Sequence, residues 1–424
     1  MKPQKKSYSN FITSQSAKRP TKFNFLSLFS GAGIGDYGLK LAGGNCIGAC
    51  EIDPSRAAVH YANIGSKVWG NLRTENIEII KHYQGQAIDL LIATPPCQSF
   101  STANSRRGLR EDPDHASKDE RNSLFFEALH IARALKPSVI FFENVPNFLK
   151  RQIRSENGKI VGRVHEFIDA SLADYSSWQG TLCFSKFGVP QRRKRSIAIF
   201  VRNDLKVSGD ILIKKYLSPD CWSYIPEGSP KSILQAIEDL PELDGYSEIT
   251  AISPNDPLHQ VPVYTDQHYS WISNIAKGSG KSAWENACIK CGCDQADFFE
   301  IECVSCGEVI TTRPHIKEKN GTIRAIKGFK TSYKRMPPDT LAPTITTASG
   351  HFSSDLKLHP IQNRVLSARE CARLQTIPDT FQWPVEQKYR KGYLFREMIG
   401  EAVPPLVTYQ FGTALTSLLK SIKL

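Results

Sequence analysis

The sequence predicts an α/β protein with a doubly wound sheet and a smaller, irregular second domain. From about residue 24 to residue 201, short apolar runs alternate with amphipathic stretches, as strands and crossover helices do in a parallel sheet. After Arg202, proline, serine and glycine become frequent and the periodicity fades. A chain of 424 residues is long enough for two domains.

Individual elements follow from the same patterns. The expected strands are residues 23–29, 45–51, 87–94, 138–144 and 195–201. Residues 123–135 have apolar positions at helical spacing, and Pro137 ends this expected helix. Regular patterning returns at 367–375 and at 397–422, where a Pro-Pro pair precedes a helix-like stretch. We therefore expect a basic tail (1–22), a main domain (23–241 and 360–424) and an irregular domain (242–359).

Composition narrows the class of protein. The net charge of +12 favours a polyanionic partner, because Lys and Arg that neutralise phosphates release condensed counterions. No apolar run approaches the roughly 20 residues that cross a bilayer, and the basic N-terminal stretch lacks the apolar region of a secretory signal. We expect a cytoplasmic protein with no membrane role. Its tail is either a solvated extension or an arm that contacts DNA.

A glycine-rich turn follows the first expected strand at residues 29–35. Glycines there let a ligand approach the backbone, although any tight turn between a strand and a helix has the same composition. Glu51 lies about 20 residues further on, at the end of the next expected strand, where a carboxylate can accept hydrogen bonds from ribose hydroxyls. These residues favour a nucleoside cofactor, and their spacing fits both a dinucleotide and S-adenosylmethionine.

Two reactive groups follow the next expected strands. Cys97 stands in a Pro-Pro-Cys-Gln segment just past a carboxyl end, where α/β sheets gather their active sites. Glu143 leaves an apolar strand after two phenylalanines, and burial there disfavours its ionised form. The alternatives are a structural cysteine and a glutamate that caps a strand end.

Six ordered blocks resemble the DNA cytosine-5 methyltransferases. They are Phe-Ser-Gly-Ala-Gly at 29–33, Pro-Cys-Gln at 96–98, Glu-Asn-Val at 143–145, Gln-Arg-Arg-Lys-Arg at 191–195, and the segments 364–381 and 399–405. The resemblance covers about 23–205 and 360–424, and its order and spacing match the family's. It implies an S-adenosylmethionine-dependent methyltransferase with a Rossmann-like sheet, and it makes the irregular domain a target-recognition domain.

The resemblance implies the catalytic roles. Cys97 adds to C6 of cytosine while Glu143 supplies a proton or hydrogen bond at N3, so that C5 becomes a carbon nucleophile. Arg195 holds the cytosine O2, Arg193 organises the site around it, and Asn144 positions the thiol or the base.

The family match also implies the cofactor contacts. They are Phe29, Gly31, Ala32, Gly33, Glu51, Ile52, Asn71, Leu72, Pro96, Glu401 and Ala402. Two positions depart from the family's pattern, which often has aspartate where this chain has Asn71 and asparagine where it has Glu401. The contacts of these two residues with the cofactor are therefore in doubt.

Double-stranded DNA is the partner that the resemblance implies. Enzymes that react with a base inside a duplex first rotate it out of the stack. The expected DNA contacts are Gln98, Ser101, Arg106 and Arg107 on the loop after the thiol, together with Gln191 and Thr344. Thr344 matches the family threonine that holds the phosphate beside the flipped base.

The irregular domain contains two Cys-x2-Cys-Gly pairs, Cys288 with Cys291 and Cys303 with Cys306. Their spacing suits one tetrahedral structural Zn²⁺, with Cys293 and His315 as possible substitutes in the shell. The alternative is four free thiols. Four thiolates leave no open coordination position, which argues against a catalytic zinc.

Two other functions compete with DNA methylation. A tRNA cytosine-5 methyltransferase would share the catalytic blocks, and a DNA-binding protein could carry a disabled methylase fold. The long, cysteine-bearing insert favours DNA, and the presence of Cys97, Glu143 and Arg195 favours an enzyme. We further expect a monomer of restriction-modification type that acts on the nucleoid, with a separate cognate restriction endonuclease as its possible companion.

Overall fold

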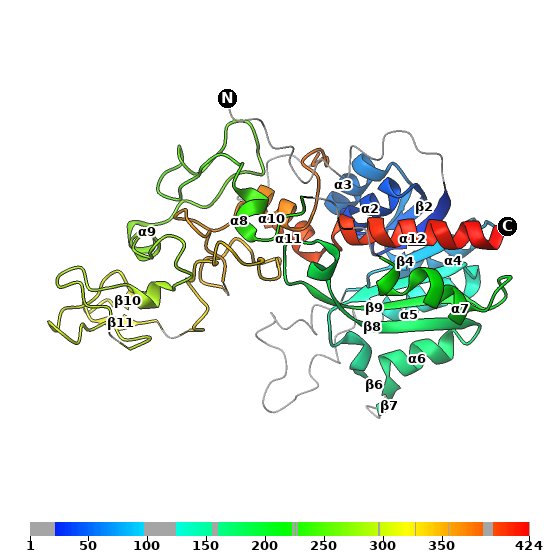
Figure 1. The fold of residues 1–424 in the computed structure, drawn as a ribbon, viewed down its shortest axis with the longest axis horizontal. Helices are drawn as coiled ribbons and strands as arrows, with labels where there is room; N and C mark the ends of the chain where they lie inside the picture. The colour runs from blue at the N-terminus through cyan, green and yellow to red at the C-terminus, as the bar shows by residue number, and fades with distance from the viewer. Residues whose placement is uncertain are drawn as a thin grey trace.

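The structure is a computed structural model. It describes residues 22–96, 124–154, 160–222, 225, 228–295, 297–326, 328–354, 356–384 and 393–423. In Figure 1 the large sheet and its helices form one end of the molecule, and the segment that carries β10 and β11 forms the other.

Seven strands of the described chain form one sheet in the order β3-β2-β1-β4-β5-β9-β8. They are β1 (Phe23–Leu28), β2 (Gly44–Cys50), β3 (Val68–Trp69), β4 (Leu90–Ala93), β5 (Val139–Asn144), β8 (Tyr175–Cys183) and β9 (Lys194–Arg202). Two short hairpins pair β6 (Gln152–Arg154) with β7 (Ile160–Arg163), and β10 (His315–Lys317) with β11 (Ile323–Ala325). The predicted α/β class and the five predicted strands are confirmed.

The helices alternate with these strands through the first half of the chain. The α-helices are α2 (Ile34–Leu41), α3 (Pro54–Ile64), α4 (Leu72–Tyr83), α5 (Leu124–Leu135), α6 (Val164–Ser171), α7 (Gly209–Leu212), α8 (Ile233–Ile237), α9 (Asp266–Ser273), α10 (Ala368–Leu374), α11 (Tyr393–Glu401) and α12 (Pro405–Lys423). Shorter helical turns are η4 (Phe148–Lys150), η5 (Phe184–Phe187), η6 (Ile213–Leu217), η7 (Pro219–Cys221) and η8 (Ala283–Glu285). The helix expected at 123–135 is confirmed as α5.

The expectation of parallel strands is wrong for residues 195–201. Strands β1 to β5 pair in parallel, but β9 runs antiparallel to β5, and β8 runs antiparallel to β9. The reason lies in the connection: β8 and β9 are joined by a short link through η5, which forms an antiparallel pair, and no crossover helix separates them. Because β9 is reversed, it begins at the edge where β5 ends.

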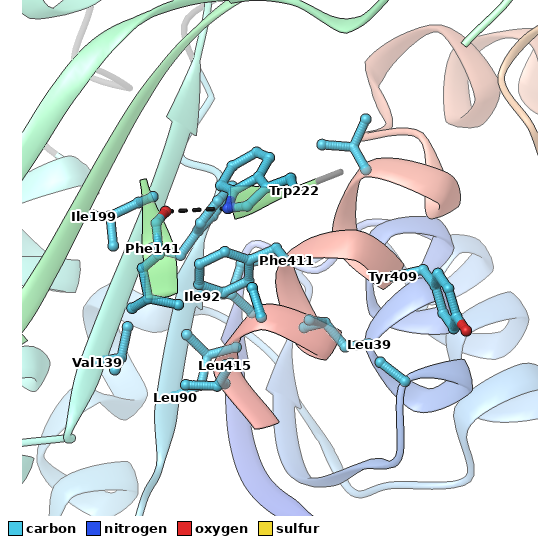
Figure 2. Close-up of a cluster of buried hydrophobic side chains, with 14 of the residues drawn as sticks. Leu39, Leu90, Ile92, Val139, Phe141, Ile199, Trp222, Tyr409, Phe411 and Leu415 are labelled. Carbon is cyan, nitrogen blue, oxygen red and sulfur yellow. Dashed lines mark hydrogen bonds between the residues drawn. The ribbon is translucent and has the colours of Figure 1, made fainter. Parts of the chain in front are cut away.

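Helices bury both faces of the sheet. On one face α4, α5 and α6 cover a core that includes Leu26, Leu91 and Ile140. On the other face α12 contributes Phe411 and Leu415, which point at Ile92 and Phe141 of the sheet (Figure 2). The rings of Phe141 and Phe411 lie 4.6 Å apart between centroids. The C-terminal helix thus belongs to the same core as the first strands.

A second core lies beyond the sheet. It gathers aromatic and aliphatic side chains from residues 264–365, among them the fully buried Trp271 and Trp284. Regular elements here are short, as the loss of periodicity in the sequence predicts.

A buried ion pair lies where this region returns to the sheet-bearing part. Both Nη atoms of Arg364 donate to the carboxylate of Glu370, each at 2.7 Å, and both side chains are fully buried. Glu370 also accepts from the backbone N–H of Ser367, which caps α10. Burial alone would raise the pKa of Glu370, but the neighbouring Arg364 guanidinium holds that pKa at about 2.

We predict that Glu370→Gln lowers the free energy of unfolding by about 3–5 kcal/mol, because Arg364 is then buried without its counter-charge. The carboxylate pKa is depressed in the folded state. Its contribution is therefore fully present above the ordinary value of 4.5 and is lost as the pH falls towards about 2.

Urea unfolding from pH 7 down to pH 3 measures both effects. The wild type should lose stability below about pH 4.5, and Glu370→Gln should lack that part of the loss. Glu308→Gln, which removes an exposed partner of Lys290, is the matched control and should change stability far less. Equal effects from the two substitutions would contradict the role of the buried pair.

Candidate active site

The candidate site lies at the sheet edge where the parallel strands end. Strands β1, β2, β4 and β5 present their carboxyl ends there, and β9 starts there because Asn144 pairs with Ser196. This edge is where open α/β sheets bind ligands. The sheet therefore brings together the described residues of the four predicted blocks that lie between residues 29 and 195.

The glycine-rich turn makes a tight bend between β1 and α2. Phe29, Gly31 and Gly33 all have positive φ (58°, 55° and 72°). A Cβ on Gly33 would lie 2.7 Å from the ring of His60, so this position excludes a side chain. Gly33 caps α2 without a side-chain hydrogen bond, and the first N–H groups of the helix remain available to a ligand.

Glu51 connects the second strand to this turn. One carboxylate oxygen accepts from the Gly31 N–H at 2.9 Å, and the other accepts from the Asp53 N–H at 2.9 Å. Burial raises the pKa of Glu51 despite these bonds. Ile52 beside it is 67% exposed, which leaves an apolar surface next to a carboxylate. Further along, Asn71 uses its side chain to cap α4, and Leu72 is buried in the sheet core.

Glu143 and Arg195 form an ion pair at the edge of the site. The Nε of Arg195 lies 3.0 Å from Oε1 of Glu143, and the glutamate side chain is 7% exposed. Desolvation raises the pKa of Glu143, in spite of the opposing attraction of Arg195 and Arg193. A carboxyl group with a raised pKa can remain protonated near neutral pH and donate a proton.

Asn144 connects this carboxyl-bearing strand to the segment before the predicted nucleophile. Its Nδ2 donates to the Pro95 carbonyl at 3.0 Å, and its Oδ1 accepts from the Val145 N–H at 2.8 Å. Pro96 is the last described residue before the gap. The predicted residues Cys97, Gln98, Ser101, Arg106 and Arg107 all lie outside the described residues.

Gln191 and Arg193 are both fully buried. The Gln191 amide donates to the Leu374 carbonyl and to the Gln375 side chain, and its oxygen accepts from the Ile345 N–H. Arg193 donates to the carbonyls of Ile345, Gly400 and Glu401. In this structure both residues bind other segments of the chain together. The Gln191 side chain is thus directed into the protein interior, and its contact with DNA stays a prediction.

Thr344 lies beside the same segment. Its hydroxyl donates to the Arg192 carbonyl at 3.0 Å, and the backbone of Ala342 forms a parallel bridge with Gln191. The segment that carries Thr344 is thereby held next to the start of β9, although it comes from the distant irregular region.

The four predicted metal ligands form one cluster. The sulfur atoms of Cys288, Cys291, Cys303 and Cys306 all lie within 4.8 Å of one another. The Cys288–Cys306 and Cys291–Cys303 pairs have Sγ···Sγ distances of 3.7 and 3.4 Å. Tetrahedral zinc with Zn–S bonds of about 2.3 Å places its sulfurs about 3.8 Å apart. The thiols therefore have the geometry of a zinc site.

Both halves of the cluster have the same backbone turn. The glycine after each pair has positive φ and donates its N–H to the carbonyl of the first cysteine, at 2.8 Å in each half. Cys293 is outside the cluster. His315 is bonded elsewhere, to the Arg313 carbonyl and to the Gln267 amide.

Sequence reasoning missed two residues of the site. Gln375 donates to the Ile399 carbonyl and so supports the end of α11. Arg56 on α3 forms ion pairs with Glu401 at 3.1 Å and Glu397 at 3.6 Å. Neither Gln375 nor Arg56 belongs to a short-range sequence pattern. Their place in the site becomes visible only through their contacts with residues distant in the sequence.

The sheet, its glycine turn and the buried carboxyl group define a nucleoside-cofactor enzyme of the α/β class. The family model of C-5 cytosine-specific DNA methylase matches residues 23–417, so the chain belongs to that family and is a DNA cytosine-5 methyltransferase that uses S-adenosylmethionine.

Two relatives and one solved structure are also similar to this chain. The chain is 30% identical over 396 residues to the Type II methyltransferase M1.HgaI of Avibacterium volantium, a match that covers 90% of this chain and 95% of that protein. It is 27% identical to M.DdeI of Desulfomicrobium norvegicum, over 95% of this chain and 90% of the relative. The crystal structure of S. pombe Dnmt2 methyltransferase shares the fold at a TM-score of 0.54 and 17% identity, over 95% of this chain and all of that one.

The residues at the sheet edge fit S-adenosylmethionine. Glu51 offers a carboxylate for ribose hydroxyls, and the exposed Ile52 offers an apolar contact for an adenine ring. The uncapped start of α2 offers N–H groups for a carboxylate.

Within the described part of the chain, every helix is too short or too polar to cross a membrane.

We predict that Asn144→Asp impairs methyl transfer by about 10²-fold. The aspartate can still accept from the Val145 N–H, but it places an oxygen against the Pro95 carbonyl and moves the segment before Cys97. Asn144→Ala should cost about 1–3 kcal/mol of stability because it leaves buried groups unpaired.

Transfer of a labelled methyl group and thermal unfolding measure these effects. Asn274→Ala, which removes an exposed asparagine bonded to the Ser270 carbonyl, is the control for loss of an amide. Normal activity in Asn144→Asp would show that the bond to Pro95 does not position the site.

Proposed function

We propose that this enzyme methylates a specific cytosine in double-stranded DNA through a covalent adduct between Cys97 and a flipped-out base. The observation that carries the proposal is the buried Glu143 beside Arg195 at the same sheet edge as the Pro95-Pro96 segment that leads to Cys97. Family membership establishes the reaction, and the geometry supports the assignment of roles.

The chain's own residues make C5 of cytosine reactive. The Cys97 thiolate forms a bond to C6, the C5–C6 π pair forms a C4–C5 double bond, the C4–N3 π pair moves onto N3, and Glu143 donates a proton there. Arg195 holds the O2 atom and stabilises the charge that develops on the ring. When bound, S-adenosylmethionine supplies an electrophilic methyl group to C5.

The reaction ends with recovery of the thiolate. A water molecule acts as base and takes the C5 proton, the C–H electron pair regenerates the C5–C6 double bond, the S–C6 bond breaks, and Cys97 leaves with its electron pair. The proton at N3 returns to Glu143. Burial raises the pKa of Glu143, which favours its protonated form as the donor at N3.

The base must leave the stack before a thiol can reach C6. We propose that the DNA backbone is bound by Gln98, Ser101, Arg106 and Arg107. The phosphate beside the flipped base is bound by Thr344. The bond from the half-buried Thr344 hydroxyl to the Arg192 carbonyl supports this, because Arg192 is next in sequence to Arg193, to which we assign a role in the site.

We predict that Cys97→Ala abolishes turnover and leaves DNA binding intact, since the thiol is needed for the chemistry and not for the grip. Cys221→Ala removes another thiol, on η7, and should behave like the wild type. Methyl transfer to duplex DNA and to tRNA, with binding measured separately, tests the reaction and its substrate.

Trapping with a duplex that contains 5-fluorocytosine tests the adduct itself. Fluorine at C5 blocks the release step, so the wild type and Cys221→Ala should become crosslinked and Cys97→Ala should not. A crosslink at another residue, or none in the wild type, would refute the covalent mechanism.

We propose that residues 242–359 form the target-recognition domain. Acidic and basic side chains lie in separate segments of this region. Residues 287–310 carry five acidic side chains and one lysine, whereas residues 315–334 carry six Lys and Arg against one glutamate. Phosphates repel the first segment and attract the second, so β10, β11 and the following loop should meet the DNA backbone.

We further propose a structural Zn²⁺ on the four clustered cysteines. Residues around the cluster are bonded to the core of the region: Arg313 donates to the carbonyls of Asn286, Asp297 and Glu300. The Asn286 amide in turn donates to the Trp271 carbonyl of α9. Zinc would fix this segment, and with it the start of the basic hairpin two residues after Arg313.

We predict that the purified wild type holds about one zinc per chain and that Cys303→Ser loses it, with weaker sequence-specific DNA binding. Cys293→Ser is the matched control, because Cys293 lies nearby but outside the cluster, and it should keep the metal. Elemental analysis and DNA titrations measure both. A wild type without metal would remove the zinc proposal and leave the catalytic assignment standing.

The Type II names of the relatives support a wider role. We propose that the enzyme is the monomeric modification half of a restriction-modification pair, acting in the cytoplasm on nucleoid DNA while a separate endonuclease cuts unmethylated sites.

A further inference from the structure

Three buried polar side chains are hydrogen-bonded to one another beside the glycine-rich turn. The Oγ of Ser27 on β1 donates to Oδ1 of Asp36 on α2 at 2.8 Å. The Nε2 of His60 on α3 lies 3.0 Å from the other carboxylate oxygen, Oδ2. All three side chains are at most 3% exposed. These bonds connect the strand before the turn with the two helices that follow it.

The surroundings of His60 determine which ring nitrogen carries the proton. An ionised carboxylate only accepts hydrogen bonds, so the bond to Asp36 requires the proton on Nε2. The Nδ1 atom is buried and has no hydrogen-bond partner among the described residues. A proton on Nδ1 would therefore be unpaired in the interior, which disfavours the other tautomer. Asp36 thus fixes both the tautomer and the orientation of the ring.

The same bonds direct the Asp36 carboxylate away from the start of its own helix. Asp36 is the third residue of α2, a position from which an acidic side chain can turn back and accept from a backbone N–H in front of the helix. Here both carboxylate oxygens accept from Ser27 and His60 instead. The start of α2 is left without a side-chain cap, so its N–H groups stay open to a ligand.

The imidazole ring lies directly against the turn. A Cβ on Gly33 would lie 2.7 Å from Cδ2, 3.1 Å from Cγ and 3.2 Å from the Cα of His60. Gly33 is the residue that precedes α2, and its φ of 72° belongs to the left-handed region. The ring therefore supports the backbone at the point where the turn enters the helix.

Glu51 holds the other part of the turn, because its Oε2 accepts from the Gly31 N–H at 2.9 Å. The Ser30 N–H between them donates to the Cys50 carbonyl at 2.9 Å. The second strand thus fixes residues 30 and 31, and Gly33 is in contact with His60. A glycine has more backbone freedom than any other residue, so loss of the ring should release Gly33 first.

We infer that His60, oriented by Asp36, is a positioning residue for S-adenosylmethionine: it holds the glycine-rich turn in its binding conformation before the cofactor arrives. The inference rests on the proposed contacts of this turn with the cofactor. A turn that is already ordered loses less conformational entropy on binding, which increases affinity. His60 needs no contact with the cofactor for this role.

Binding of S-adenosylmethionine and S-adenosylhomocysteine in the absence of DNA tests the inference. In His60→Leu the Kd of both ligands should rise about tenfold, because both use the same turn. His259→Leu is the matched control: His259 is also fully buried and bonded at both ring nitrogens, to Ser367 and to the Pro241 carbonyl. It should lose a similar amount of thermal stability and keep both Kd values within about twofold.

Two further measurements separate positioning from general destabilisation. Methyl transfer by His60→Leu should show a raised KM for S-adenosylmethionine and a nearly unchanged kcat, because the ring does not touch the reacting atoms. In the free enzyme, the backbone amides of residues 30–35 should exchange hydrogen faster in His60→Leu, whereas those of β4 should keep their protection. His259→Leu should leave the exchange of residues 30–35 unchanged.

Asp36→Asn tests the bond that orients the ring. The asparagine keeps the size of the side chain, but when its oxygen accepts from Ser27 its NH₂ group faces Nε2 of His60. The ring can then accept only by moving its proton to the unpartnered Nδ1. The Kd of both ligands should rise by about threefold, less than in His60→Leu because the ring is still present.

The possible failures are distinguishable. If neither ligand binds the wild type, the proposed cofactor site is wrong. If both bind and His60→Leu raises their Kd no more than His259→Leu does, the cofactor site stands and the inference about His60 is overturned. If His60→Leu does not fold, His60→Gln, which keeps a donor for Asp36 but lacks the flat ring, is judged by the same comparison with His259→Gln.

Discussion

The candidate site depends on buried hydrogen bonds that tie the late part of the chain to the start of β9. Gln191 and Arg193 precede this strand, and both direct their polar atoms at backbone groups of residues 345, 374 and 400–401. Carbonyls at the end of α11 lack partners within their helix, and buried carbonyls need donors. Arg193 supplies these donors, and in doing so it ties the end of α11 and the segment of Ile345 to the start of β9.

Local features of the fold could be predicted from the sequence. The alternation of apolar runs located β1, β2, β4 and β5, and Pro137 located the end of α5, because these signals act within a few residues. The direction of β9 could not be predicted in this way, since its apolar run has the same composition in either orientation. Strand β8 was missed because its side chains are mostly half-buried and show no apolar run. Its length and place are set by pairing with β9.

The site residues likewise fall into those that local sequence patterns predict and those that only the folded structure reveals. Glu51 and Glu143 could be proposed because each follows a recognisable strand, and the four clustered cysteines because their spacing is short and repeated. Gln375 and Arg56 have no such local sign, and their meaning comes from contacts with Gln191 and Glu401, which only folding brings close. A motif match gives the position of Gln191 in the sequence but not the direction of its side chain, which is buried and points inward.

Charged groups of both signs are paired around the site: Glu143 lies beside Arg195, and Glu401 at the end of α11 lies beside Arg56. Because each carboxylate has an arginine neighbour, the site can be partly buried without leaving a charge uncompensated, which would cost several kcal/mol. The two glutamates differ in burial: the Glu143 side chain is 7% exposed and burial raises its pKa, whereas the Glu401 side chain is 36% exposed. The difference between these two glutamates is therefore one of solvent access, because Glu143 lies in the buried strand β5 and Glu401 lies at the end of α11.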